Sequence, residues 1–347
     1  MTQNIWLRVL VCLIAANMIF GALYFADSVF APVACALLII ALTWPLQARL
    51  QSAMPRLAAL FIVVGITITV FFCFASIAAW GFGRVGRTFI AETQYFQALY
   101  DKVALWLDGH GIAIAGLWGE HFNVSWFVRM LQSVGARANT TISFWLVVAV
   151  YVMLGLLEVD VVARKISSEL SPRTARVIID GSAATAAKLQ KYLLIRTLMS
   201  AATGLFVWLI AKASGLHLAT EWGVIAFTLN YIPFIGPFIA TVFPTLFALA
   251  QFDSWQSALI VFAGLNIVQF VIGSYIEPRL SGSALSISPS LVLFSVFFWA
   301  FLWGLFGAFI GVPIVIAALT FCAQHPSSRW IANLLGGSDG IATERSG

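Results

Sequence analysis

The stretch N-Y-I-P-F-I-G-P-F, Asn230 to Phe238, lies inside an apolar run that begins near Trp222 and ends near Ala250. Each proline removes a backbone donor and crowds the preceding helical turn, while the glycine loosens the backbone. Two prolines and a glycine so close together therefore predict a broken helix. A helix that ends at membrane depth leaves free N–H or C=O groups that can meet a small polar solute or an ion.

The composition of the chain is that of an integral membrane protein. Of its 347 residues, 61% are hydrophobic and 10% are charged, and the mean hydropathy is +0.96. Soluble domains carry about 25% charged residues, whereas a bilayer core requires runs of about 20 apolar residues. We expect an all-α integral membrane protein with about eight hydrophobic segments in contact with membrane lipid. The net charge of +5 fits basic cytoplasmic loops and calls for no nucleic acid.

The first half of the chain predicts four spans, at residues 7–25, 31–46, 57–80 and 144–157. The first is too long for a typical signal-peptide core and is followed at once by further spans, so we interpret it as an uncleaved span. The loop 47–56 carries two arginines and no acid, which predicts a cytoplasmic loop and a cytoplasmic N-terminus. Residues 158–196 carry seven basic residues against four acids, which places them on the same side.

These patterns divide the chain into five regions. Residues 1–80 hold three spans, 81–143 form an extramembrane helical insert, 144–196 hold the fourth span and a cytoplasmic amphipathic helix, 197–322 form a transport core, and 323–347 form a disordered tail. Within the core, spans at 197–214 and 255–276 alternate with broken runs at 222–250 and 290–322. Such paired breaks are the sequence signal of a transporter's substrate site.

The breaks leave two topologies open. If each broken run is a re-entrant hairpin, the two units of the core form an inverted repeat; if each run crosses the membrane, the units are parallel. Both topologies leave the C-terminus in the cytoplasm.

We expect the solute site between the two breaks. The residues assigned to solute contact are Asn230, Tyr231, Pro233, Gly236 and Pro237 at the first break, Asn266 and Gln269 on the span between the breaks, and Gly304, Gly307, Gly311 and Pro313 at the second. Glu277, at the end of the intervening span, is the candidate coupling residue. Polar residues in a membrane are costly unless they are paired or face water, which makes them functional candidates.

Each assignment has a structural alternative. The amides can bond across helices, Glu277 can be an interfacial ion-pair partner, and the first break can be a proline kink. The pattern G-A-F-I-G, from Gly307 to Gly311, can simply allow close helix packing.

Missing motifs narrow the function classes. The chain has no G-x-x-x-x-G-K loop for ATP and no H-E-x-x-H motif, and its four histidines and four cysteines are scattered singly. We therefore expect no cofactor, no metal site and no catalytic residue, and the chain is not expected to be an enzyme.

Three ordered blocks resemble the signature blocks of the AI-2E (autoinducer-2 exporter) family of bacterial transporters. They are N-Y-I-P-F-I-G-P (230–237), E-P-R-L-S-G-S-A-L-S-I-S-P (277–289) and F-W-A-F-L-W-G-L-F-G-A-F-I-G-V-P (298–313), and the layout is similar from about residue 7 to 322. The resemblance implies a homo-oligomer of the bacterial inner membrane with an elevator-like mobile domain. It also implies export of autoinducer-2 or sodium/proton antiport. Ser288 stands where many members have His, so a coupling role of that histidine would be lost here.

The expected function is a secondary transporter that exports a small polar organic solute. The first alternative is a sodium/proton antiporter in which Glu277 titrates. The second is a membrane scaffold for cell-envelope assembly that acts through the insert at 81–143 and transports nothing.

Overall fold

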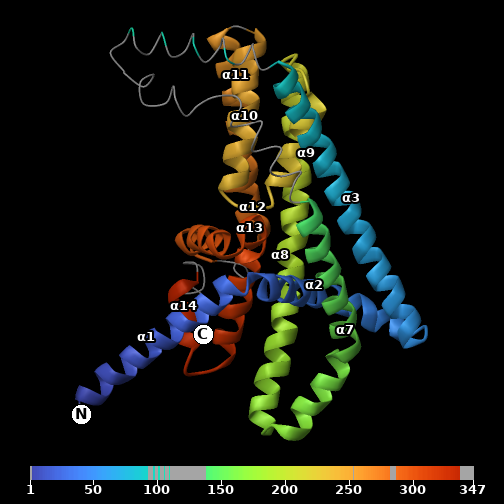
Figure 1. Cartoon of the computed structure of the whole chain (residues 1–347), viewed down its shortest axis with the longest axis vertical. Helices are drawn as coiled ribbons and strands as arrows, with labels where there is room; N and C mark the ends of the chain where they lie inside the picture. The colour runs from blue at the N-terminus through green and yellow to red at the C-terminus, as the bar shows by residue number, and fades with distance from the viewer. Residues whose placement is uncertain are drawn as a thin grey trace. The chain divides into compact units, whose positions relative to one another are not determined.

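The computed structural model describes residues 2–92, 97, 101, 105, 109, 138–252, 254–281 and 287–336. These residues form helices joined by turns, with one isolated β-bridge between Ile287 and Gly336. The helices in chain order (Figure 1) are α1 Thr2–Phe25, α2 Asp27–Gln51, α3 Arg56–Ala91, α7 Ala138–Glu169, α8 Pro172–Ala213, α9 Ala219–Leu229, α10 Ile235–Phe252, α11 Trp255–Gln269, the π-helix η1 Phe270–Ile276, α12 Glu277–Ser281, α13 Pro289–Gln324 and α14 Arg329–Leu335.

Seven helices in the described part of the chain are long and apolar enough to cross a membrane. They are Asp27–Gln51, Arg56–Ala91, Ile142–Glu169, Pro172–Ala213, Ile235–Phe252, Trp255–Ser281 and Pro289–Gln324, and Leu13–Phe25 is a shorter apolar helix. Large apolar side chains cover their outsides: Phe61 is 67% exposed and Phe301 is 73% exposed. Apolar surface of this extent fits lipid rather than water. The expected all-α integral membrane protein is confirmed.

Several helix bounds differ from the sequence expectation. Helix α3 continues to Ala91, into the segment 81–143 expected to be an insert, and most of that segment lies outside the described residues. Helix α8 is one helix from Pro172 to Ala213 rather than an amphipathic helix followed by a span. The boundary between polar and apolar composition near residue 196 does not break it, because no proline lies inside it. In the tail, residues 329–335 form α14, and 337–347 lie outside the described residues.

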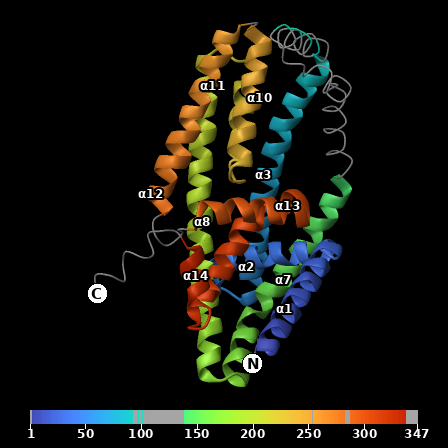
Figure 2. The ribbon, with the colours of Figure 1, turned by 90° about the vertical axis from the view of Figure 1, so that its left-hand side faces the viewer.

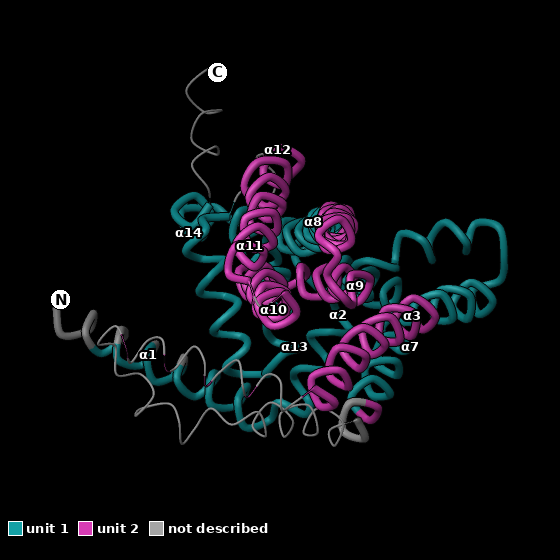
Figure 3. The backbone as a smooth tube through the Cα atoms, turned by 90° about the horizontal axis from the view of Figure 1, so that it is seen from above, with its two compact units in different colours: residues 1–67, 144–192, 283–347 teal, residues 68–143, 193–282 magenta. Residues whose placement is uncertain are grey.

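The chain divides into two compact units, coloured separately in Figure 3. Unit 1 comprises residues 1–67, 144–192 and 283–347, and unit 2 comprises residues 68–143 and 193–282. Each unit therefore contains one of the two broken runs.

The core of unit 1 is formed by α2, the start of α3, α7 and α13. Its buried side chains are Ala31, Cys35, Ala36, Leu60, Val63, Val148, Val152, Leu156, Leu302, Trp303 and Ile310. The amide of Gln47, which is fully buried, donates a hydrogen bond of 3.2 Å to the carbonyl of Leu156, and Arg56 donates to the carbonyl of Leu157. These bonds tie the end of α2 and the start of α3 to the middle of α7.

The chain reverses between α7 and α8, as Figure 2 shows at the end of the green helix. The Ser171 hydroxyl accepts a hydrogen bond of 3.3 Å from the backbone N–H of Thr174, and Pro172 is the first residue of α8. Serine followed by proline is a common start of a helix, because the serine oxygen satisfies a free N–H and proline lacks one. Gln190 then donates to the carbonyl of Ala41 at 3.1 Å, which joins α8 to α2.

The broken run of unit 1 is a helical hairpin within α13. Trp303 (φ −129°, ψ 19°) and Gly304 (φ 61°, ψ −142°) leave helical geometry, and the ribbon bends sharply in Figure 2. A Cβ atom on Gly311 would lie 2.9 Å from the carbonyl oxygen of Ser295, sixteen positions earlier. In a straight helix those residues would be about 24 Å apart along the axis. The two halves of α13 therefore fold back on one another.

The broken run of unit 2 is the hairpin formed by α9 and α10. The rings of Trp222, near the start of α9, and Phe247, near the end of α10, pack with centroids 5.7 Å apart. Gly236 abuts the carbonyl of Leu229 so closely that no side chain would fit there. Helix α9 has 11 residues, about 16 Å of length, which is too short to cross a core of about 30 Å.

Candidate functional site: a polar cluster at the α9–α10 turn

A row of polar residues on α8 faces the α9–α10 hairpin inside unit 2. Arg196, Ser200 and Thr203 are four and three positions apart, so they share one face of the helix. Their exposed fractions are 6%, 0% and 0%. The hydroxyl of Thr203 is buried and has no hydrogen-bond partner among the described residues. A buried polar group without a partner in an apolar helix is costly, so this face is a candidate site for polar contacts.

The turn between α9 and α10 supplies the other side of the cluster. Asn230 caps the C-terminus of α9, and its amide donates a hydrogen bond of 3.2 Å to the Ser200 hydroxyl. The Tyr231 hydroxyl bonds the hydroxyl of Thr197 at 3.0 Å. Asn230 is 5% exposed, whereas Thr197 is exposed. The cluster therefore runs from an enclosed end at Ser200 to an open end at Thr197.

The proline and glycine residues of the first break shape this turn. Residues 230–234 form the turn itself, with the N–H of Ile235 bonded to the carbonyl of Pro233 at 2.7 Å. Phe234 has φ 62°, a left-handed conformation that costs free energy for a bulky residue. Gly236 and Pro237 lie in the first turn of α10, where proline is tolerated because the first N–H groups of a helix have no partner.

A partly buried ion pair lies next to the cluster. Nη1 of Arg196 is 2.6 Å from Oε1 of Glu277, and the two side chains are 7% and 22% exposed. Nε of Arg196 is buried without a hydrogen-bond partner in the described structure. Glu277 is the first residue of α12 and follows the π-helix η1. Short π-helical segments are often found at functional sites.

The two polar residues expected on α11 make different contacts. Asn266 is exposed and donates to the carbonyl of Phe262 in its own helix at 2.8 Å. Nε2 of Gln269 is buried without a partner in the described structure, at the residue where α11 gives way to η1. Because η1 winds differently from an α-helix, the face shared by Asn266 and Gln269 does not continue regularly to Glu277. Their role in solute contact stays a prediction.

The second set of predicted residues lies in the α13 hairpin of unit 1. Of these residues only Gly304 stands at the turn, so the expectation that Gly307, Gly311 and Pro313 also lie at the break is wrong. Gly307 instead abuts the carbonyl of Trp299, and Gly311 lies against Ser295. The close packing expected of the G-x-x-x-G pattern is confirmed, between two halves of one helix. Pro313 is buried in the second half, and a solute role for these residues stays a prediction.

Ser288 has a structural role at the start of α13. Its hydroxyl accepts a hydrogen bond of 3.3 Å from the N–H of Leu291, and Pro289 occupies the first helical position. Serine is therefore sufficient at this position to begin the helix.

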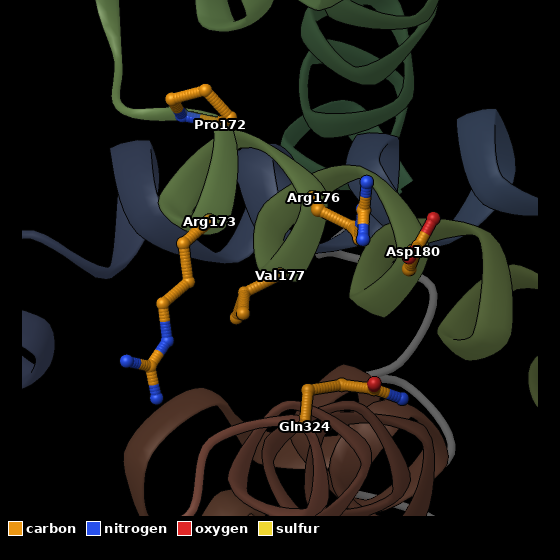
Figure 4. Close-up of a pocket in the computed structure, with 6 residues that line it drawn as sticks. All are labelled: Pro172, Arg173, Arg176, Val177, Asp180 and Gln324. Carbon is orange, nitrogen blue, oxygen red and sulfur yellow. The ribbon is translucent and has the colours of Figure 1, made fainter.

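A separate surface hollow of about 370 Å³ lies in unit 1, lined by Pro172, Arg173, Arg176, Val177, Asp180 and Gln324. In Figure 4 the side chain of Arg173 extends toward the end of α13, and Arg176 lies beside Asp180. No group of three or more His, Cys, Asp or Glu residues that could hold a metal ion occurs in the part of the chain that the structure describes.

Sequence reasoning missed Arg196, Thr197, Ser200 and Thr203. By composition Arg196 ends the basic cytoplasmic segment and Thr197 begins a span, so an expected boundary separates these two neighbours. The available signal was the spacing of the polar residues in an otherwise apolar helix, which places three of them on one face.

The fold and the cluster define a class: a polytopic α-helical membrane protein with two helical hairpins in its spans, one of them meeting buried polar groups. Comparison with known proteins gives the family. The chain belongs to the family described as AI-2E family transporter, whose model matches residues 13–326. It is therefore a multi-pass membrane protein of a transporter family.

Individual relatives agree with this assignment. The chain is 26% identical to the AI-2 transport protein TqsA of Escherichia coli (strain K12) over 95% of each chain. It is 34% identical to YhhT of the same organism over 42% of this chain and 41% of YhhT. A Borreliella burgdorferi protein is 34% identical over 43% of this chain and 41% of its own length.

Proposed function

We propose that the protein is a secondary transporter that exports a small polar organic solute across the bacterial inner membrane. The observation that carries the proposal is the pairing of α8 with the α9–α10 turn through Asn230–Ser200 and Tyr231–Thr197. These bonds hold polar groups together inside apolar helices, and the unpartnered Thr203 hydroxyl lies on the same face. A solute could exchange its hydrogen bonds with water for bonds to such groups.

The other expected features are part of the same proposal. We infer that both hairpins are re-entrant, that they belong to an inverted repeat, and that the protein is a homo-oligomer with both termini in the cytoplasm. The short helix α9 supports the first point. The missing ATP-binding loop supports transport driven by a gradient.

Autoinducer-2 is the first solute to test, because the relative TqsA carries that solute in its name. Purified protein in proteoliposomes should show saturable flux of autoinducer-2 or of another small polar metabolite. The Asn230→Ala variant should lose most of that flux, because Ser200 and the solute lose a partner. Gly65→Ala is the matched control, because Gly65 has open space around its Cβ position.

Two outcomes would contradict the proposal. Flux unchanged by Asn230→Ala would remove the cluster from the transport path. No flux for any solute in the panel, with a correctly folded protein, would favour the scaffold alternative, which deletion of residues 81–143 would then test.

The sodium/proton antiporter alternative places the titrating group at Glu277. In the structure Glu277 is paired with Arg196, and arginine does not release its proton in proteins. A sodium ion at Glu277 would therefore have to compete with the guanidinium. Glu277→Gln should abolish sodium- or lithium-driven proton flux if this alternative holds, and unchanged flux would eliminate the role.

A further inference from the structure

The ion pair beside the polar cluster points to the charge of the solute. We propose that Arg196 binds the carboxylate of a small hydroxylated solute, and that Glu277 occupies the guanidinium when the solute is absent. This inference rests on the proposed function and specifies its substrate class.

Arg196 has more donors than its neighbour uses. A guanidinium offers five N–H donors in a planar fork that matches both oxygens of a carboxylate. In the ion pair one contact of 2.6 Å joins Nη1 to Oε1 of Glu277. Nε, which forms one side of the fork, is buried and has no hydrogen-bond partner in the described structure. Glu277 therefore leaves part of the fork without an acceptor. The two oxygens of a free carboxylate could accept hydrogen bonds from two of its N–H groups at once.

Glu277 is the more exposed partner of the ion pair. Its side chain is 22% exposed, against 7% for Arg196. Glu277 also stands where η1 ends and α12 begins, a junction between two helical geometries rather than the middle of a rigid helix. A movement at this junction could withdraw the side chain from Arg196.

A buried arginine requires an anion, because an unpaired charge in an apolar environment is very costly. A cation cannot take the place of Glu277, and a neutral solute would leave Arg196 uncompensated. The group that replaces Glu277 must therefore carry negative charge. One guanidinium balances one carboxylate.

The remaining polar groups indicate which functional groups the solute carries besides its carboxylate. Thr197 and Ser200 on α8 pair with Tyr231 and Asn230 at the α9–α10 turn, and none of these side chains carries a charge. Hydroxyl and amide groups bind hydroxyl groups well. A small monocarboxylate with one or more hydroxyl groups fits this combination.

The test is calorimetric titration of the purified full chain with lactate and gluconate, and with lactamide as the neutral counterpart of lactate. The carboxylates should bind, and lactamide should bind at least about tenfold more weakly because it cannot pair with the guanidinium. Glu277→Gln removes the internal competitor and should tighten lactate binding by about tenfold. Arg196→Lys keeps the charge without the fork and should weaken lactate binding by about tenfold.

The matched control is Arg279→Gln, which removes a positive charge two positions from Glu277. Arg279 is exposed and stacks on Tyr275, with 3.7 Å between its guanidinium carbon and the ring centroid. The lactate affinity should not change in this variant. The double variant Arg196→Gln/Glu277→Gln replaces the ion pair with two neutral amide side chains of similar size. It should remain folded in a thermal unfolding scan and should give no heat of lactate binding.

Equal binding of lactate and lactamide, or wild-type lactate affinity in the double variant, would overturn the proposal. Failure of the proposed transport function can be distinguished from failure of the carboxylate site, because the titration measures binding without requiring flux across a membrane. Lactate binding without flux of any solute would contradict transport and keep the Arg196 site. Flux of a neutral solute that lactate does not inhibit would support transport and overturn the carboxylate site.

Discussion

Gly204 of α8 and Gly223 of α9 pack backbone against backbone: a Cβ atom on either one would lie 2.8 Å from the carbonyl oxygen of the other. This approach is closer than any side chain allows, and it brings α8 and α9 together near the Asn230–Ser200 hydrogen bond. Gly204 lies one helical turn from Ser200, and Gly223 lies about two turns from Asn230. Small residues allow such contacts between membrane helices. The geometry of the polar cluster therefore depends on two residues that bear no polar side chain.

Alanine at either glycine should force the two helices apart. We expect Gly204→Ala and Gly223→Ala each to lower the free energy of unfolding by about 1–3 kcal/mol, the usual range for overpacking. Steric trapping in bicelles would measure this quantity. Gly65→Ala is the control, since nothing lies within 4 Å of its Cβ position, and it should be neutral or stabilising. Equal stability of all three variants would contradict the close packing.

The hydrogen bond between Asn230 and Ser200 should appear as a coupling energy. In a double-mutant cycle with Asn230→Ala and Ser200→Ala, we expect a coupling of about 1 kcal/mol in the free energy of unfolding, as for a typical buried hydrogen bond. The two residues are 5% and 0% exposed, so solvent cannot easily replace the lost partner. Additive effects of the two substitutions would show that the pair does not interact.

Alanine should be destabilising at two glycines of the α13 hairpin, for different physical reasons. Gly304 has open space around it but a backbone (φ 61°, ψ −142°) that L-residues rarely adopt, so Gly304→Ala should cost about 1–3 kcal/mol through strain. Gly307 has an ordinary helical backbone but abuts the carbonyl of Trp299. D-alanine introduced at position 304 by semisynthesis should restore the stability lost in Gly304→Ala, because a D-residue favours positive φ. D-alanine at position 307 should not restore stability, because that backbone is helical. Rescue at both positions, or at neither, would contradict this distinction.

Trp303 should anchor the end of α1 inside unit 1. Its indole N–H donates to the carbonyl of Leu23 at 3.0 Å, one of the last carbonyls of α1, which have no partner within the helix. Trp303→Phe should therefore cost about 1 kcal/mol more in the free energy of unfolding than Trp299→Phe. The two substitutions remove the same volume, and in the described part of the chain the Trp299 indole packs on Gly311 without donating such a bond. Identical costs would show that the indole hydrogen bond is unimportant.

The sequence predicts the breaks better than the site. Pro233 and Gly236 act through local backbone geometry, so the break at residues 230–234 could be inferred from the letters alone. In the sequence Gly307 and Pro313 are indistinguishable in role from Gly304, yet they lie within the helix. The sequence alone does not distinguish a glycine that permits close packing from a glycine that permits a turn. Which role applies depends on the neighbour, here Trp299.

The contacts of the polar cluster could not be predicted from the sequence either. Arg196 and Glu277 are 81 positions apart, and no local pattern pairs them. Thr197 and Ser200 could have been recognised by their spacing, but their partners Tyr231 and Asn230 are set by the packing of α8 on α9. Hydrophobicity predicts that these helices lie in a membrane, and it does not predict which faces meet.

The proposed function requires that the cluster of α8 and the α9–α10 turn contacts the transported solute. The most direct test is the rate of maleimide alkylation of a Thr197→Cys variant, made in a chain whose four native cysteines are replaced by alanine. Thr197 is the exposed end of the cluster. A solute that gives saturable flux, with autoinducer-2 and lactate as the first probes, should slow alkylation with the same half-saturation concentration. The rate at an Arg279→Cys control should stay constant. A transported solute that leaves the alkylation rate at Thr197→Cys unchanged would contradict the account.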